Sequence, residues 1–158
     1  MQRLNKTFLI LSFVPPFAVG IIAGILTGSN TSEVLQGITR PPLTPPAILF
    51  PIVWTILYFL MGAATYIIYE SKAFANDLRK AFTIFYGQLF VNFIWPFVFA
   101  NLGNFLLAFL ILVILDFLVA LNVLAYSRIQ RISGLLLLPY LLWCAFATYL
   151  NLAIVILN

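Results

Sequence analysis

Five continuous runs of apolar residues, separated by short polar segments, dominate the sequence. Each run is long enough to cross a hydrocarbon core of about 30 Å as a helix that rises about 1.5 Å per residue. The runs lack the alternation of apolar and polar positions that is typical of membrane barrels, so helices are expected to satisfy the backbone. The pattern predicts helices near residues 8–28, 47–69, 81–100, 104–126 and 134–157.

The composition explains where these helices lie. Of the 158 residues, 64% are hydrophobic and 8% are charged, whereas soluble domains carry roughly 25% charged residues. Lipid must therefore be the solvent for most of the surface. We predict an all-α integral membrane protein, a five-transmembrane-helix bundle in which residues 1–158 form a single membrane domain.

The first apolar run has two interpretations. Arg3 and Lys6 precede it, and the Ala-Val-Gly stretch at residues 18–20 is a site at which a signal peptidase could cut. However, apolar residues continue to Leu26, and the uncut run reaches membrane-spanning length. We expect this segment to be retained as the first helix.

Small residues recur on one face of that first helix. Gly20, Gly24 and Gly28 repeat every four residues, a spacing that lets another helix approach closely. The approaching helix can belong to the same bundle or to a second copy in a homodimer. Packing inside the bundle is the simpler interpretation.

The longest connection is predicted over residues 29–46, polar in its first half and rich in proline in its second. The prolines remove backbone donors and bias each preceding residue toward extended conformations, so this part forms a semi-rigid loop. Long ordered loops usually have a function, and we interpret this one as a lid over a pocket. The predicted lid residues are Arg40, Pro41, Pro42, Leu43, Pro45 and Pro46.

Aromatic and polar side chains share helical faces in three of the predicted spans. Trp54, Tyr58, Met61 and Thr65 fall within about 40° of one another on a helix of 3.6 residues per turn. The side-chain amides of Gln88 and Asn92 would lack hydrogen-bond partners in lipid, so the helix face that carries them must point into the bundle or toward a polar ligand. Packing of rings and hydrogen bonding between helices explain these faces equally well. The other two faces carry Gln88, Asn92 and Trp95, and Tyr140, Trp143, Ala147 and Asn151. We predict that these seven residues, together with Trp54 and Tyr58, are the nine that bind a ligand.

Asp116 is the one ionisable side chain inside a predicted span. A carboxylate there costs roughly 2.5 to 3.5 kcal/mol on insertion scales unless it finds a partner. We predict a structural role in which it bonds to a nearby Asn or Thr. Cys144 is the only cysteine and the chain has no histidine, so neither a metal site nor a resident cofactor is expected.

The basic residues predict the orientation. Seven of them lie on one side of a five-span topology and only Arg40 lies on the other, which places the N-terminus in the cytoplasm. We therefore predict a multi-pass protein of a bacterial cell membrane. The net charge of +4 is a topology signal and does not indicate a nucleic-acid partner. The seven residues are Arg3, Lys6, Lys72, Arg79, Lys80, Arg128 and Arg131.

Four stretches resemble the TspO/MBR family of tryptophan-rich sensory and translocator proteins. They are RPPLTPP from residue 40, FPIVWTILYFLMGAATY from residue 50, GQLFVNFIW from residue 87 and LLPYLLWCAFATYLN from residue 137. The resemblance covers about residues 38–158. It implies a five-helix bundle, commonly dimeric, that binds porphyrins and haem, synthetic isoquinolines and, in animal members, cholesterol.

The resemblance also implies which residues line the pocket: Trp54, the face with Gln88 and Asn92, and Trp143 with Ala147. Trp54 and Trp143 match positions that are associated in bacterial relatives with light-dependent porphyrin breakdown. Leu43 departs from the family, because tryptophan usually occupies that position.

Three functions follow from these features. We predict a membrane receptor, either a sensor or a carrier, for porphyrin- or haem-type tetrapyrroles, because rings can stack on a flat conjugated ligand while amides and Arg40 meet its carboxylates. The first alternative is a porphyrin-degrading enzyme. Since the sequence offers no nucleophile paired with a base, only Trp54 and Trp143 acting with light and oxygen would serve it. The second alternative is a small transporter of hydrophobic ligands.

Overall fold

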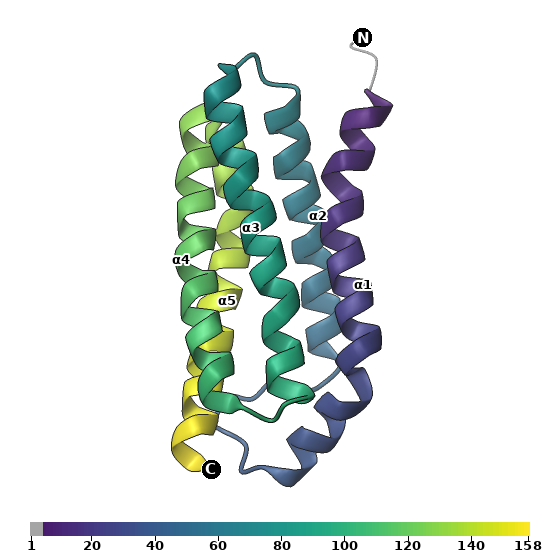
Figure 1. Ribbon diagram of the computed structural model, residues 1–158, viewed down its shortest axis with the longest axis vertical. Coiled ribbons are helices and arrows are strands. Elements are labelled where there is room, and N and C mark those ends of the chain that lie inside the picture. The colour runs from purple at the N-terminus through teal and green to yellow at the C-terminus, as the bar shows by residue number, and fades with distance from the viewer. Residues whose placement is uncertain (1–4) are drawn as a thin grey trace.

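The structure is a computed structural model that describes residues 5–158, and within that range the chain folds as five α-helices without a strand (Figure 1). All five are long and apolar enough to cross a membrane, which confirms the predicted fold class. Arg3 lies outside the described residues. The helices are α1 (Lys6–Gly37), α2 (Leu49–Tyr69), α3 (Ala75–Ala100), α4 (Phe105–Ile129) and α5 (Arg131–Leu157).

The helices form a closed ring. Helix α1 packs along α2 and α3, α5 packs along α2 and α4, and α3 packs along α4. The N-terminus and the α2–α3 turn lie at one end of the bundle, and the α1–α2 connection and the last residue lie at the other (Figure 1). The centre is filled by fully buried apolar side chains from the last four helices, among them Met61, Phe85, Leu115, Tyr126 and Leu137.

The predicted loop over residues 29–46 is wrong in its first half, because α1 continues to Gly37. The side-chain hydroxyls of Thr27, Thr31 and Ser32 donate to the carbonyl oxygens four residues earlier, over 2.8, 2.7 and 3.2 Å. These bonds satisfy polar side chains without ending the helix, and such bonds tend to bend it. The last turns of α1 tilt inward beneath the bundle (Figure 1). The connection is therefore only residues 38–48.

The other helices also differ from the predicted bounds at their ends. Helix α3 begins at Ala75, so Asp77, Arg79 and Lys80 occupy its first turns instead of a charged loop. Helix α5 begins at Arg131, ahead of the predicted residue 134. Hydropathy marks the lipid-immersed part of a helix, while the backbone continues into the polar interface for another turn or two.

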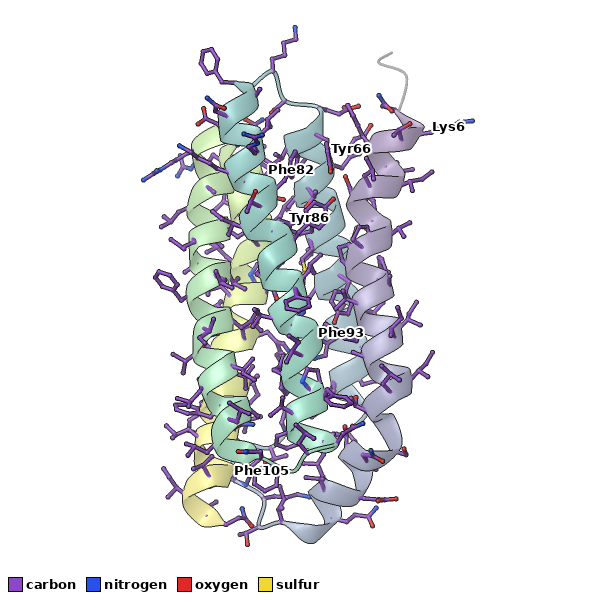
Figure 2. The ribbon with its side chains drawn as sticks, viewed as in Figure 1. Lys6, Tyr66, Phe82, Tyr86, Phe93 and Phe105 are labelled. Carbon is purple, nitrogen blue, oxygen red and sulfur yellow. The ribbon has the colours of Figure 1, made fainter. Side chains whose placement is uncertain are left out.

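Aromatic packing closes the end of the bundle that carries the N-terminus. The rings of Tyr69 and Phe82 stack with centroids 4.1 Å apart, and the hydroxyls of Tyr69 and Tyr86 lie 3.1 Å apart. Figure 2 shows Phe82 and Tyr86 at this end, as well as Lys6. These rings help to fill the space between the helices there.

Glycines bring α1 against α2. A Cβ at Gly20 would overlap the ring of Tyr58, and a Cβ at Gly62 would overlap the ring of Phe13. Gly24 and Gly28 have open space at the Cβ position. The small-residue face of α1 therefore packs inside the bundle at Gly20 only.

The described basic residues occupy the ends that the topology prediction requires. Lys6, Lys72 and Arg131 lie at turns or helix starts on the side of the N-terminus, and Arg40 lies in the opposite connection. Which end faces the cytoplasm stays a prediction.

Candidate functional site

A cavity of about 440 Å³ opens at the end of the bundle that carries the α1–α2 connection. Its walls come from α1, α2, α3 and α5, with the connection across its mouth. This volume lies within the range of about 300 to 1,000 Å³ that is usual for small-molecule sites. The residues that line it include Trp54, Tyr58, Asn92, Trp95, Ala147 and Asn151, six of the nine predicted ligand-binding residues.

One wall of the cavity is almost free of large side chains. Gly24 and Gly28 of α1 line it, with nothing within 4 Å of the position that a Cβ would take. Thr27 and Thr31 lie on the same wall, and their hydroxyl hydrogens are already used inside the helix. A flat ligand can therefore approach the α1 backbone directly.

The wall formed by α2 and α3, the two helices beside α1, is aromatic. Trp54 stacks on Tyr58, with ring centroids 5.4 Å apart and an interplanar angle of 29°. From α3, Trp95 meets Phe99 edge to face, with centroids 6.5 Å apart and an angle of 61°. Phe50, from the first turn of α2, completes this wall. Such rings offer broad apolar faces with little conformational entropy to lose.

Two buried amides bring unused hydrogen-bonding atoms to the cavity. Asn92 accepts a hydrogen bond from the indole nitrogen of Trp95 over 3.1 Å, which fixes its orientation. Asn92 Nδ2 and Asn151 Oδ1 have no partner among residues 5–158, although the two side chains are only 2% and 3% exposed. Buried polar atoms without partners are rare and call for an explanation. Because both residues line the cavity, these atoms are the candidate donor and acceptor for a bound ligand.

The connection across the mouth is held by local hydrogen bonds. Arg40 Nε donates to the carbonyl oxygen of Leu35 over 2.9 Å, and Thr44 Oγ1 donates to that of Pro41 over 2.7 Å. Leu43 has a φ of 68°, a left-handed conformation that is uncommon outside glycine, and its side chain is 75% exposed. Of the predicted lid, Arg40 and Pro41 line the cavity. The lining does not include Pro42, Leu43, Pro45 or Pro46.

Gln88 and Tyr140 lie deeper than the cavity. The Tyr140 hydroxyl donates to Gln88 Oε1 over 2.6 Å, and both residues are at most 1% exposed. Trp54 covers this pair, with its ring edge to face on Tyr140 at a centroid distance of 6.1 Å. This bond joins α3 to α5, the interhelical alternative that the sequence left open, and leaves Gln88 Nε2 without a partner among residues 5–158.

Trp143 also lies outside the cavity lining. Its ring packs edge to face on Phe50, with centroids 5.9 Å apart, and Phe50 is the residue that faces the cavity. Its indole nitrogen is buried and lacks a hydrogen-bond partner in the described part of the chain. Of the two tryptophans that the resemblance implied, the structure therefore brings only Trp54 to the cavity.

The sequence analysis missed the α1 wall and the two phenylalanines, Phe50 and Phe99. A signal for the wall was present, since Gly24 and Gly28 repeat at the spacing of a helix face and Thr27 and Thr31 repeat beside them. That spacing indicates a face without saying whether a helix or a space lies opposite.

Asp116 is not among the residues that line the cavity. Thr148 Oγ1, on α5, donates to Asp116 Oδ2 over 2.7 Å, which confirms the predicted Asn or Thr partner. In residues 5–158, no group of three or more His, Cys, Asp or Glu side chains is placed to hold a metal ion.

A second hollow, of about 550 Å³, lies at the opposite end, by the α2–α3 and α4–α5 turns. Its lining includes Glu70, Lys72 and Gln130, and none of the predicted site residues. It lacks tryptophan and buried amides, so we regard the 440 Å³ cavity as the candidate ligand site.

Comparison with known proteins places the chain in a family. The model of the TspO/MBR family matches residues 12–157. A tryptophan-rich protein TspO from Archaeoglobus fulgidus is 38% identical over 155 residues, which cover 98% of this chain and 99% of that protein. A tryptophan-rich sensory protein from Cereibacter sphaeroides is 29% identical over 150 residues, covering 95% and 91%. A translocator protein from Ovis aries is 32% identical over 113 residues, covering 71% and 67%. On these matches and its five membrane-spanning helices, the chain belongs to the TspO/MBR family.

Proposed function

We propose that this protein is a membrane receptor, either a sensor or a carrier, that binds a porphyrin- or haem-type tetrapyrrole in the 440 Å³ cavity. One observation carries the proposal: broad ring faces and two unpartnered buried amide atoms line the same cavity. Ligand sites typically combine a mostly apolar lining with a few polar groups that fix the orientation of the ligand.

The shape of the cavity supports a flat ligand. A conjugated macrocycle can lie against the α1 backbone at Gly24 and Gly28 and meet the rings of Trp54 from α2 and Trp95 from α3. Stacked or edge-to-face rings contribute about 0.5 to 1.5 kcal/mol beyond the burial of apolar area. A tetrapyrrole offers such faces on both sides, which a sterol, with its saturated rings, lacks.

The polar groups support a ligand with carboxylates at one edge. Arg40 lies at the mouth, and because its Nε donates to Leu35, the terminal nitrogens remain for a carboxylate. Deeper in the cavity, Asn92 Nδ2 and Asn151 Oδ1 can bond to polar atoms of the ligand. The names of the relatives, which include "sensory" and "translocator", favour a sensing or carrying role.

Light-dependent breakdown of the ligand would be a slow side reaction of the same site. An illuminated porphyrin with oxygen oxidises nearby side chains, and in this cavity those are Trp54 and Trp95, with Trp143 behind Phe50. We expect conversion to require light, because no histidine is available as a general base near neutral pH.

Fluorescence titration tests the proposal. A dicarboxylate porphyrin should bind the purified protein in the micromolar range and quench tryptophan fluorescence. Trp54→Phe together with Trp95→Phe should weaken binding and remove most of the quenching, while Trp143→Phe, the matched control, should have the smaller effect. Unchanged affinity in the double variant would refute a site in this cavity, and so would a loss of binding confined to Trp143→Phe.

The proposal includes a cytoplasmic N-terminus, so that the cavity opens on the outer side of a bacterial cell membrane. It also includes the homodimer that the family resemblance implies, which cross-linking in native membranes would test.

A further inference from the structure

The last residue of the chain makes an unusual contact with the connection across the cavity mouth. Asn158 Oδ1 accepts a hydrogen bond from the backbone nitrogen of Thr39 over 2.8 Å, and Asn158 Nδ2 donates to the carbonyl oxygen of Thr39 over 3.2 Å. One side-chain amide thus pairs with both backbone groups of one residue, as a neighbouring strand residue would. The two residues are 119 positions apart in the sequence.

The amide of Asn158 is fixed on its own side as well. Its second Nδ2 hydrogen is donated to the carbonyl oxygen of Ile154 over 3.0 Å, in the last turn of α5. Every hydrogen-bonding atom of the amide is therefore engaged, and the side chain is oriented before it meets Thr39. Ile154 itself lines the cavity.

The contact joins the connection after α1 to the end of α5, and these two helices otherwise pack along other helices of the ring. Helix α1 packs along α2 and α3, and α5 packs along α2 and α4. An apolar cluster around Ile154 also contacts Leu35 and Ile38, which places Thr39 beside the end of α5. The Asn158 amide then fixes the backbone immediately before Arg40 and Pro41, the two predicted lid residues that line the cavity.

From these contacts we propose that Asn158 is a positioning residue that latches the connection over the cavity mouth and so sets the rate at which a ligand enters and leaves. The rate part of this proposal rests on the proposed function, whereas the latch itself does not. Because Asn158 bonds to Thr39 only through the backbone of that residue, the latch depends on the Asn158 amide and is independent of the side chain at position 39.

The latch predicts amide exchange at Thr39 without any ligand. In the full-length protein in nanodiscs, hydrogen exchange of the Thr39 amide should speed up roughly 2- to 12-fold in Asn158→Ala, the range expected when ordinary hydrogen bonds are lost. Asn158→Asp keeps an acceptor for the Thr39 nitrogen and loses both donors, so its exchange rate should fall between those of the unchanged protein and the alanine variant.

Two control variants isolate the contact. Thr39→Val keeps the backbone pair and should leave the protection of amide 39 unchanged once its rate is corrected for the intrinsic rate of valine. Asn101→Ala removes another asparagine bond at the same end of the bundle, from Asn101 Nδ2 to the carbonyl oxygen of Leu26 over 3.2 Å, and should also leave it unchanged. Exchange at Thr39 that is equally fast in Asn158→Ala and in the unchanged protein would overturn the latch.

Stopped-flow measurements with the dicarboxylate porphyrin test the rate part. In Asn158→Ala, association and dissociation should both accelerate by roughly 2- to 12-fold, with the dissociation constant nearly unchanged, because a gate that favours neither the free nor the bound state shifts no equilibrium. Faster exchange at Thr39 with unchanged ligand rates would refute the gate. Faster exchange at Thr39 in a protein that binds no porphyrin would support the latch and refute the proposed function instead.

Discussion

The hydrogen bond between Tyr140 and Gln88 gives a direct way to separate structural from ligand-binding residues. Tyr140→Phe removes the hydroxyl that donates to Gln88 Oε1 over 2.6 Å. Gln88 Nε2 already has no partner in the described range of residues, so the variant leaves the whole buried amide unsatisfied. An unsatisfied buried group costs about 1 to 3 kcal/mol. For a chain of this size that corresponds to a melting temperature lower by roughly 2 to 12 °C.

The companion variant should restore most of that loss. Gln88→Met combined with Tyr140→Phe replaces both partners by apolar groups of similar volume, which is close to neutral when no polar atom remains unpaired. Thermal unfolding followed by circular dichroism measures both effects, and porphyrin titration of the same samples should show nearly unchanged affinity. The reasoning is wrong if Tyr140→Phe leaves the melting temperature unchanged, or if it lowers porphyrin affinity tenfold without loss of stability.

Three further predictions follow from the walls and ends of the bundle. Gly24→Leu should weaken porphyrin binding at least tenfold with little change in melting temperature, because its Cβ meets open space and the side chain then fills the cavity; a stable variant with normal affinity would contradict this. Gly134→Ala should destabilise the protein by roughly 1 to 3 kcal/mol, since a Cβ there would overlap Ser127 between α4 and α5, and thermal unfolding beside the control variant Gly87→Ala, whose Cβ on α3 meets open space, would test it. Impermeant thiol reagents should label Leu43→Cys and not Asn76→Cys in intact cells, and the opposite pattern would reverse the topology.

The membrane-spanning core of each helix could be predicted from the sequence, but the ends could not. Apolar runs mark where lipid surrounds the chain, and five such runs correspond to the five helices. The stretch from Ser29 to Gly37 looked like a loop because it is polar, yet hydroxyl groups such as that of Thr31 bond within the helix and allow it to continue. Polarity at a membrane surface does not distinguish a loop from a helix that has left the lipid.

The helix faces that form the candidate site could be predicted from the sequence. How far each residue lies from the cavity could not. Helical spacing correctly directs Trp54, Asn92 and Asn151 toward a common space. It cannot show that Phe50 stands between Trp143 and that space, because Phe50 comes from another helix. The glycine face of α1 shows the same limit, since spacing gives a direction and only the assembled bundle shows what lies in that direction.

The hydrogen bonds within α1 also determine which chemical groups that wall can recognise. The hydroxyls of Thr27, Thr31 and Ser32 each direct their hydrogen to a carbonyl oxygen of the helix, so the oxygens have only lone pairs to offer to the cavity. A wall of this kind attracts N–H groups and repels carboxylates. If the proposed tetrapyrrole binds here, its carboxylates would turn away from α1 toward Arg40. Under the proposed function, the polarity of the α1 wall would therefore give a nearly symmetric disc-shaped ligand a single preferred orientation.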